Sequence, residues 1–551
     1  LRDRTGIVQL AFDEGTSRDI FQKAFAVRAE FVLLARGLVR ERTSKNMEIP
    51  TGEIEVEVQE LRVLAKAETP PFEVLEDSNV KEDTRLKYRY LDLRRPNLQR
   101  NIIARHKLVK IAHDYFDRHG FIEIETPDLI ASTPEGARDY LVPSRVFPGS
   151  FFALPQSPQL YKQLLMLSGF DRYMQVARCF RDEDLRADRQ PEFTQIDFEM
   201  SFVDQEDVMA IGEGFIQEAY REICGVEIPL PLPRLTWDEA MRRFGSDKPD
   251  LRFGLELTDV SGLLQGTGFK VFAGALAEGG SVRGICLKGE AEKLSRKEID
   301  KLQEWIKAYG AKGLAWTRLA EKETSSYEKF LTQEESAAIR AAMGAEPGDV
   351  LFLVADGDNS VVFASLGALR CELARRFGLI DASRPCLLWV TDFPQFEYSK
   401  EEDRYVAMHH PFTAPRDEDL DKLESDPGHV YAKAYDMVAN GYELGGGSIR
   451  INDPEVQERM FQALGFTPEQ AQARFGFLLN AFRYGAPPHG GMAWGLERIM
   501  MVLLGVDNIR DVVAFPKVAS SAEPMSGAPG RVDPKQLAEL GIALLPGEEN
   551  T

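Results

Sequence analysis

The stretch FTQIDFEMSF, at residues 193–202, alternates polar and apolar side chains. Because successive side chains in a strand point to opposite faces, period two places Gln195, Asp197 and Glu199 on one face. The opposite face carries Ile196, Phe198, Met200 and Phe202. The pattern predicts a β-strand with one apolar face and one strongly polar face.

Another strand is predicted just upstream, at residues 174–181, and a charged loop over residues 184–192 joins the two. This upstream strand ends in Arg181. Two interpretations fit so charged a face. It is the solvated side of a hairpin, or it is the floor of a ligand site in which the donors of Arg181 face a phosphate or a carboxylate.

The segment YDMVANGYELGGGSIR, at residues 435–450, predicts a second hairpin, because Asn-Gly favours a two-residue turn. With the turn at residues 440–441, Asp436 lies on the same face as Glu443, one diagonal step away at roughly 7–8 Å. Two carboxylates at that spacing can share one Mg²⁺ with substrate phosphates. The alternative is a pair of unrelated surface carboxylates.

Three glycines follow at residues 445–447, and glycine inside a strand usually marks a bulge or a close ligand. Glu443 and Arg450 have opposite parity, so a regular strand would send them to opposite faces. If both serve one pocket, the glycine run must be bulged or bent.

The segment GGMAWGLER, at residues 490–498, precedes an apolar helix at residues 499–504. Glycines at a strand-to-helix junction let the backbone approach a nucleotide, and Arg498 adds charge beside the helix N-terminus. Packing alone is an equally good explanation of such glycines.

Composition limits the class of protein. The chain has 551 residues, 44% of them hydrophobic, which excludes a disordered or collagen-like chain and predicts three or four domains. The sequence contains no run of eighteen apolar residues, so it predicts no membrane-spanning helix. The five separated cysteines favour a reducing cytoplasm over a disulfide scaffold or a zinc site. The net charge of −21 argues against nucleic acid as a partner unless basic residues gather on one face.

The pattern along the chain predicts an α+β protein of several domains. Residues 1–67 read as a small β-barrel or sandwich with a bulge near Gln59. Residues 68–100 read as a linker, 101–254 as the first part of a mixed domain, 255–385 as an inserted α/β domain, and 386–551 as the return to the first domain with a C-terminal extension. The chain opens as if within a β-hairpin, so we expect an N-terminal piece to be missing.

Basic residues gather in the linker, where residues 81–100 hold seven Lys and Arg against three Asp and Glu. One interpretation is a solvated hinge, as charge runs usually are. The other is a hinge that contacts phosphates between two nucleic-acid-binding parts.

Taken together, these segments resemble the three motifs of class II aminoacyl-tRNA synthetases. The helix and strand ending at Pro127 resemble motif 1, residues 180–199 motif 2, and residues 495–498 motif 3. The segments TPEGARDY, LPQSPQLYKQ and HHPF, at residues 133–140, 154–163 and 409–412, are similar to the bacterial aspartyl-tRNA synthetase family of subclass IIb. The resemblance covers nearly the whole chain. It implies a truncated N-terminal OB-type anticodon-binding barrel, an antiparallel catalytic sheet, and an insertion at about 255–385 like one in the B subunit of a tRNA-dependent amidotransferase.

The resemblance also implies site residues. Those around L-aspartate would be Glu135, Gln159, Lys162, Arg181, Asp197, His410 and Arg450. Those around ATP would be Arg181, Asp182, Glu183, Gln190, Glu443, Gly495, Leu496, Glu497 and Arg498. Asp436 and Glu443 would bind Mg²⁺, with Arg181, Glu443 and Arg498 as the catalytic set. Gln9 would face the tRNA anticodon, and Pro127 would lie in a homodimer interface.

The implied reaction is attack of the aspartate carboxylate on the α-phosphate of ATP, followed by transfer to the terminal ribose hydroxyl of tRNA. Arg450 and Lys162 would select the side-chain carboxylate over an amide. Three alternatives stay open: a sister enzyme for asparagine or lysine, an enzyme that charges tRNA for both aspartate and asparagine, and an idle tRNA-binding paralogue. Intact Arg181, Glu443 and Arg498 speak against the last.

Overall fold

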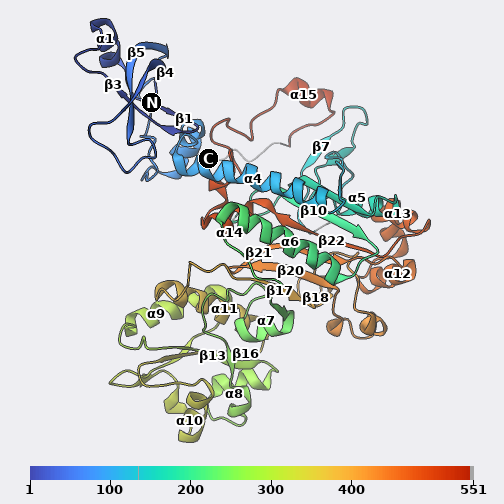
Figure 1. Ribbon diagram of the computed structural model, residues 1–551. Coiled ribbons are helices and arrows are strands. Elements are labelled where there is room, and N and C mark those ends of the chain that lie inside the picture. Colours follow the sequence, from blue (N-terminus) through green and yellow to red (C-terminus); the bar gives the residue numbers. More distant parts are fainter. Residues whose placement is uncertain (134–135, 186, 546–551) are drawn as a thin grey trace. The chain divides into compact units, whose positions relative to one another are not determined.

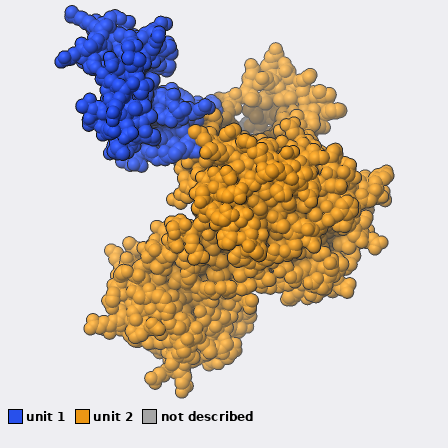
Figure 2. Space-filling view, viewed as in Figure 1, with its two compact units in different colours: residues 1–100, 524–526 blue, residues 101–523, 527–551 orange. Residues whose placement is uncertain are grey.

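The computed structural model describes residues 1–133, 136–185 and 187–545. The chain forms two compact units, residues 1–100 with 524–526 and residues 101–523 with 527–551 (Figure 2). The described residues contain no helix with an apolar run long enough to cross a bilayer.

The first unit carries a small sheet in the order β3-β5-β4, with β3 parallel and β4 antiparallel to β5. Gly37 pairs with Val58 and Arg36 with Glu60, so Gln59 has no partner and the predicted bulge is present. The sheet has three strands, whereas a complete OB-type barrel has five. The elements of this part are β1 (Arg2–Asp3), β2 (Gly6–Ile7), β3 (Gln9–Ala11), α1 (Arg18–Ala26), β4 (Val32–Glu41) and β5 (Ile54–Ala65).

The linker is more ordered than the sequence suggested. It contains α2 (Glu82–Lys87) and α3 (Arg89–Asp92), and α4 (Pro96–Arg118) begins before the predicted start at residue 101. The reason is Pro96, whose fixed φ and missing N–H suit the first turn of a helix.

Three of the linker arginines surround one buried carboxylate. Arg89 Nη1 lies 2.6 Å, Arg95 Nη1 3.2 Å and Arg85 Nη1 3.6 Å from Asp92 oxygens, and both Arg89 and Asp92 are buried. Of the two interpretations of the linker, a solvated hinge or a hinge that contacts phosphates, neither fits these three residues. They neutralise Asp92 inside the fold.

The second unit is built on an eight-stranded sheet in the order β11-β17-β20-β21-β22-β10-β9-β6. Its central pairings are antiparallel, and only the edge pairs β11–β17 and β6–β9 are parallel. The strands are β6 (Ile122–Glu123), β9 (Arg172–Phe180), β10 (Glu192–Ser201), β11 (Arg234–Thr236), β17 (Leu387–Thr391), β20 (Ala434–Ala439), β21 (Tyr442–Ile449) and β22 (His489–Gly495). The predicted strand at residues 121–127 is shorter than expected.

Helices α4, α6 (Gln205–Cys224) and α14 (Leu496–Leu504) cover one face of this sheet (Figure 1). Phe198 of β10 and Trp494 of β22 belong to the core between these layers, with ring centroids 5.5 Å apart. The face that carries Gln195, Asp197 and Glu199 is therefore the opposite one, away from these helices, as the alternation predicted.

The β20–β21 hairpin has the predicted turn and the predicted bulge. Asn440 and Gly441 both have positive φ, as a two-residue hairpin turn requires. Val438 pairs with Glu443 but Met437 pairs with Gly445, so one residue of β21, Leu444, is extra.

A second sheet belongs to the insertion and has the order β12-β13-β16-β14-β15 with its own hydrophobic core. Its elements are β12 (Thr258–Asp259), α8 (Lys270–Ala277), β13 (Ser281–Leu287), α9 (Arg296–Trp305), β14 (Ala315–Arg318), β15 (Thr324–Ser325), α10 (Gln333–Ala342), β16 (Val350–Asp356) and α11 (Asn359–Arg376). Both sheets lie in one compact unit, so the boundaries at 254/255 and 385/386 remain our prediction.

The remaining elements frame the main sheet. They are β7 (Leu141–Pro143), β8 (Phe151–Ala153), α5 (Gln159–Leu167), α7 (Trp237–Phe244), β18 (Phe396–Ser399), β19 (Arg404–Ala407), α12 (Pro454–Ala463), α13 (Pro468–Phe482) and α15 (Pro534–Glu539). Short 3-10 helices lie at Ser261–Leu264, Ile306–Tyr309, Glu328–Phe330, Asp417–Lys422, Pro427–His429 and Ile509–Asp511.

Candidate active site

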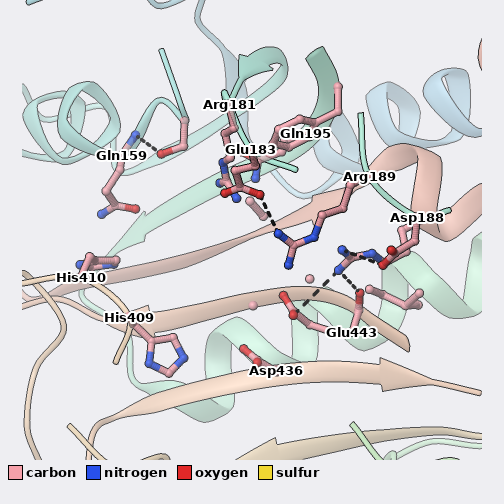
Figure 3. A pocket seen from close by; sticks show the side chains of 18 of the residues that line it. Gln159, Arg181, Glu183, Asp188, Arg189, Gln195, His409, His410, Asp436 and Glu443 are labelled. Atoms are coloured by element: carbon pink, nitrogen blue, oxygen red, sulfur yellow. Dashed lines mark hydrogen bonds and ion pairs between the residues drawn. The ribbon is translucent and has the colours of Figure 1, made fainter. Parts of the chain in front are cut away.

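A cavity of about 510 Å³ opens on the polar face of the main sheet. Its wall combines side chains from β10, β20, β21 and β22 with the loop at residues 181–190. In Figure 3 Arg181, Glu183 and Arg189 approach from one side, and Asp436 and Glu443 approach from the other. Segments far apart in sequence therefore meet here.

Two arginines bring positive charge to the cavity. The Arg181 guanidinium lies 5.1 Å from the centre of the Phe193 ring, and its Nε donates to the carbonyl of Gln156 at 3.4 Å. Arg498 Nη1 donates to the carbonyl of Glu443 at 2.7 Å, and Nη2 lies 3.4 Å from Asp188 Oδ2. A guanidinium has more N–H donors than these contacts with the described residues use, so both arginines can also bind an anionic ligand.

The acidic pair lies at the foot of the same cavity. Burial raises the pKa of Asp436 well above its usual range, and the nearby carboxylates of Glu443 and Asp247 raise it further. A divalent cation bound between Asp436 and Glu443 would stabilise the charged form of Asp436, which burial and the neighbouring carboxylates disfavour. The described residues contain no group of three or more His, Cys, Asp and Glu side chains arranged for a metal, so water and phosphate would complete the shell, as Mg²⁺ commonly accepts. The pair therefore fits Mg²⁺.

Four buried charges form a cluster behind the cavity wall. Lys162 Nζ lies 2.5 Å from Asp197 Oδ1 and 3.2 Å from Glu199 Oε2. Arg450 donates through Nε and Nη2 to the two oxygens of Glu199 at 2.8 and 3.0 Å. Lys162 and Arg450 thus meet, but they are only 2% and 3% exposed and are paired with acids instead of lining the cavity. Asp197 and Glu199, on the polar face of β10, are their partners, and the role of the two cations toward a substrate carboxylate stays a prediction.

Glu199 holds this cluster together. Its burial would raise its pKa, but the charges of Arg450 and Lys162 outweigh burial and lower the pKa to about 2. By contrast, burial raises the pKa of Asp197, and Lys162 opposes that rise. Glu199 was placed on the polar face by the alternation of β10 but was not chosen as a site residue.

His410 links the cluster to the cavity. Arg450 Nη1 lies 2.9 Å from His410 Nε2 and donates to it, because a guanidinium can only donate. His410 Nδ1 lies 3.2 Å from the Phe412 backbone nitrogen and 3.4 Å from Thr413 Oγ1. Burial and the Arg450 charge lower the pKa of His410 well below its usual range. The ring is therefore a neutral wall of the cavity.

Two buried polar atoms beside the cavity have no hydrogen-bond partner among the described residues. They are Gln159 Nε2 and Asp197 Oδ2. A buried donor or acceptor left unpaired costs about 1–3 kcal/mol, so such atoms favour a bound ligand. One is a donor and the other a carboxylate oxygen, which suits the two ends of an amino acid.

Other predicted residues hold the structure around the cavity. The Leu496 side chain lies in the core, and the Glu497 carboxylate accepts from Arg105 Nη2 at 2.7 Å and from the Thr194 N–H. The side-chain amide of Gln190 bonds the backbone of Lys517 in both directions, at 3.1 and 2.7 Å. Because these side chains already contact the protein, we expect a nucleotide to bind the backbone N–H and C=O groups of these residues more than their side chains.

Of the remaining predicted residues, Gly495 lines the cavity. The Asp182 carboxylate lies outside the cavity wall, 3.4 Å from Arg138 Nε. Gln9 is exposed on β3 and donates to Glu55 at 3.0 Å, and Pro127 is exposed. Glu135 lies outside the described residues.

Sequence reasoning missed several cavity residues. Asp188 and Arg189 belong to the charged loop that was recognised only as a connection, and Arg189 pairs with Glu183 at 2.7 Å. His409 was quoted in a motif without a role, and burial lowers its pKa. Asp247 gave no signal in the sequence, because it follows a surface helix far from the motifs.

Comparison with known proteins identifies the class. Residues 81–519 match the family described as "tRNA synthetases class II (D, K and N)". The chain belongs to this family, and the antiparallel sheet and its charged cavity are what an enzyme of this class requires. It is thus an ATP-dependent aminoacyl-tRNA synthetase.

Individual relatives narrow the comparison. The chain is 57% identical over 547 residues to an "Aspartate--tRNA(Asp/Asn) ligase" of Caldanaerobacter subterraneus subsp. tengcongensis, covering 99% of this chain and 92% of the relative. It is 57% identical over 548 residues to an "Aspartate--tRNA ligase" of Ruminiclostridium cellulolyticum, with the same coverage. Among solved structures it is similar in fold to asparaginyl-tRNA synthetase from Pyrococcus horikoshii in complex with asparaginyl-adenylate, with a TM-score of 0.56, 19% identity, and coverage of 94% of this chain and 89% of the other.

Proposed function

We propose that this chain ligates L-aspartate to tRNA through an aspartyl-adenylate. The observation that carries the proposal is a charged cavity with a cluster of paired buried charges behind its wall. The cavity has the arginines and paired carboxylates suited to ATP and Mg²⁺, and the cluster is formed by Lys162, Asp197, Glu199 and Arg450. The names of relatives at 56–58% identity support the choice of aspartate.

When aspartate binds, its charged groups would take the place of existing ion-pair partners in the cluster, so no unpaired charge would be left there. The substrate ammonium would approach the unpartnered Asp197 Oδ2, which frees Lys162 Nζ to face the substrate side-chain carboxylate together with Arg450. The unpartnered Gln159 Nε2 would donate to another substrate oxygen. Asparagine offers no second negative charge, so its binding would leave Lys162 and Arg450 facing an amide.

The chemistry needs positioning and charge stabilisation, not a protein nucleophile. Arg181 would hold the α-phosphate as the aspartate carboxylate attacks, and Arg498 would hold the departing pyrophosphate end. Mg²⁺, bound by Asp436 and Glu443, would supply charge neutralisation on the phosphates. The site roles given to Asp182, Glu183, Gln190, Gly495, Leu496, Glu497 and Glu135 belong to this proposal.

Two experiments test the reaction. Purified protein should catalyse ATP–pyrophosphate exchange with aspartate and not with asparagine or lysine, and it should aminoacylate purified tRNA for aspartate. Exchange with asparagine or lysine instead, or none at all with aspartate, would contradict the proposal.

A relaxed choice of tRNA is the second candidate. Several relatives at 56–58% identity have the name "Aspartate--tRNA(Asp/Asn) ligase", whereas others at the same identity have the name "Aspartate--tRNA ligase". Testing whether the protein attaches aspartate to purified tRNA for asparagine separates the two candidate functions.

The assembly and setting complete the proposal. We propose a cytoplasmic homodimer in which exposed Pro127 lies at the subunit interface and exposed Gln9 faces the anticodon. Sedimentation equilibrium tests the dimer, and a Gln9→Ala variant with weaker binding of cognate tRNA tests the anticodon contact.

A further inference from the structure

One stretch of chain joins the inserted sheet to the cavity. This connecting segment, residues 245–254, follows α7 and leads into the insertion. Within it, Asp247 lines the cavity that also holds Asp436 and Glu443. Lys248 Nζ lies 2.8 Å from Asp247 Oδ1. The segment therefore reaches the acidic end of the cavity from the side of the insertion.

Helix α11 of the insertion packs directly against the start of this segment. Gly245 ends α7 with a φ of +67°. A Cβ added to Gly367 of α11 would lie 2.4 Å from the Gly245 carbonyl oxygen, too close for any real contact. The two backbones touch with no side chain between them, and Figure 1 shows α11 beside α7.

The same helix clamps the far end of the segment. Arg370 is buried, and its Nη2 donates to the carbonyl oxygens of Asp250, Phe253 and Gly254 at 2.9, 3.3 and 3.0 Å. Its guanidinium lies 4.2 Å from the centre of the Phe253 ring. One side chain of the insertion thus fixes three peptide groups of the connecting segment.

The chain enters the insertion through the connecting segment and leaves it near Cys386. Both of these stretches contact the turn of the β20–β21 hairpin. A Cβ on Gly441 would lie 3.2 Å from the Asp250 Cβ, so the connecting segment packs on this turn. Where the chain leaves the insertion, the Asn440 N–H donates to the Cys386 carbonyl at 3.0 Å, and the Cys386 N–H donates to Asn440 Oδ1 at 2.9 Å. This hairpin carries Asp436 and Glu443.

We propose that the insertion positions the ATP- and metal-binding end of the cavity through the connecting segment, with Gly367 and Arg370 as positioning residues. The inference rests on the proposed function, which assigns Asp436 and Glu443 to that end. It predicts that loosening the α11 contact impairs ATP and Mg²⁺ use but not aspartate binding, whose cluster lies on α5, β10 and the end of β21.

The test is Gly367→Ala, with Gly274→Ala as its matched control. Both glycines lie inside helices of the insertion, but a Cβ at Gly274 meets nothing within 4 Å. Alanine favours helix at both positions, so damage confined to Gly367→Ala reports the displaced Gly245 and not a weaker helix.

Three measurements are made on the full-length protein. In ATP–pyrophosphate exchange we expect the KM for ATP and the Mg²⁺ concentration for half-maximal rate to rise by about tenfold in Gly367→Ala, because small misplacements of positioning groups are costly. The KM for aspartate should stay within about twofold. Without any ligand, amide hydrogen exchange should quicken over residues 434–446 in Gly367→Ala and not in Gly274→Ala.

Unchanged values for ATP, Mg²⁺ and hydrogen exchange in folded Gly367→Ala would overturn the inference, as would equal losses for ATP and aspartate. If Gly367→Ala fails to fold, Arg370→Met replaces it. Its control is Arg376→Met, since Arg376 pairs only with the neighbouring Glu372 in the described structure. Arg370→Lys, which keeps three donors for the three carbonyls, should recover part of the ATP affinity. A wild-type protein inactive with aspartate counts against the proposed function, whereas an active wild type with unaffected variants counts against this inference alone.

Discussion

At the scale of single residues, we expect specificity to depend on a neutral cluster of buried charges. Arg450 and Lys162 are held by Glu199 and Asp197 before any substrate arrives. Taking charges out of water is expensive, and the four side chains offset that cost by pairing. The pairs hold both cations in place until the proposed exchange, in which a substrate carboxylate becomes a partner of Lys162 and Arg450.

Arg450→Leu should abolish activation of aspartate, because it removes the guanidinium proposed to face the substrate and leaves Glu199 with only Lys162 as a cationic partner. ATP–pyrophosphate exchange at saturating ATP is the measurement. Near-normal exchange with aspartate in a folded variant would refute the role of Arg450.

Glu199→Gln should lower the free energy of unfolding at pH 7 by about 3–5 kcal/mol, since it leaves buried Arg450 without its anion. The pKa of Glu199 is lowered to about 2, so its ionic contribution is complete above the ordinary glutamate pKa and is lost as the pH falls through the folded value. The gap between wild type and variant should therefore shrink as the pH falls from about 4.5 towards 2.

Urea unfolding across that pH range measures this gap. The control is Glu222→Gln, because Glu222 pairs only with Arg221 at the surface in the described structure. A gap between wild type and Glu199→Gln that is independent of pH would count against the ion pair as its source.

At the scale of elements, the three glycines of β21 lie against different groups, one against a side chain of the candidate site and two against the neighbouring strand. A Cβ at Gly446 would lie 2.2 Å from Asp436 Oδ1, at the end of a movable side chain. A Cβ at Gly445 would lie 2.3 Å from the Ala493 carbonyl, and one at Gly447 would lie 2.2 Å from the Gly491 carbonyl. Only the middle glycine makes room for the acidic pair, whereas its neighbours let β21 and β22 approach.

Gly446→Ala should therefore fold but require more Mg²⁺, because the Asp436 carboxylate must turn away from its place beside Glu443. Gly445→Ala and Gly447→Ala should lower the melting temperature instead, since backbone atoms must separate. Thermal melting and the Mg²⁺ dependence of ATP–pyrophosphate exchange, measured for all three variants, check the division. A Gly446→Ala variant with unchanged Mg²⁺ dependence would remove Asp436 from the metal site.

At the scale of the whole molecule, an acidic chain must still bind tRNA. The linker supplies an excess of positive charge, but Arg85, Arg89 and Arg95 face buried Asp92. Lys81 and Lys87 are exposed, and Arg94 is partly exposed beside Glu30. Fewer linker cations are therefore available to contact tRNA phosphates than the number of Lys and Arg counted in the linker sequence.

Replacing Lys81 and Lys87 together by Ala should weaken tRNA binding and flatten its salt dependence without altering stability. Arg89→Met should instead destabilise the first unit by roughly 3 kcal/mol, the low end for a broken buried pair, because Arg95 and Arg85 still face Asp92. Filter binding at several salt concentrations and thermal melting separate the two effects. Equal tRNA affinity and salt slope in the double variant would place the tRNA path elsewhere.

The sequence by itself determined the elements and the chemistry they carry. Alternation predicted the two faces of β10, and Asn440-Gly441 predicted the hairpin turn. A bulge or bend was expected in the glycine run if Glu443 and Arg450 serve one pocket, and the bulge lies one residue before that run, at Leu444. These features follow from local rules: strand periodicity and turn geometry act over a few residues.

Only the tertiary structure decided which charges stay free. Lys162 and Arg450 were expected at a substrate carboxylate, but the tertiary structure brings Asp197 and Glu199 of β10 against them. Arg89 is paired locally, with Asp92 three residues further along the chain. Asp247 lines the cavity, and the segment that carries it packs against α11. Burial and pairing depend on which segments pack together across hundreds of residues, and no local pattern in one sequence contains that information.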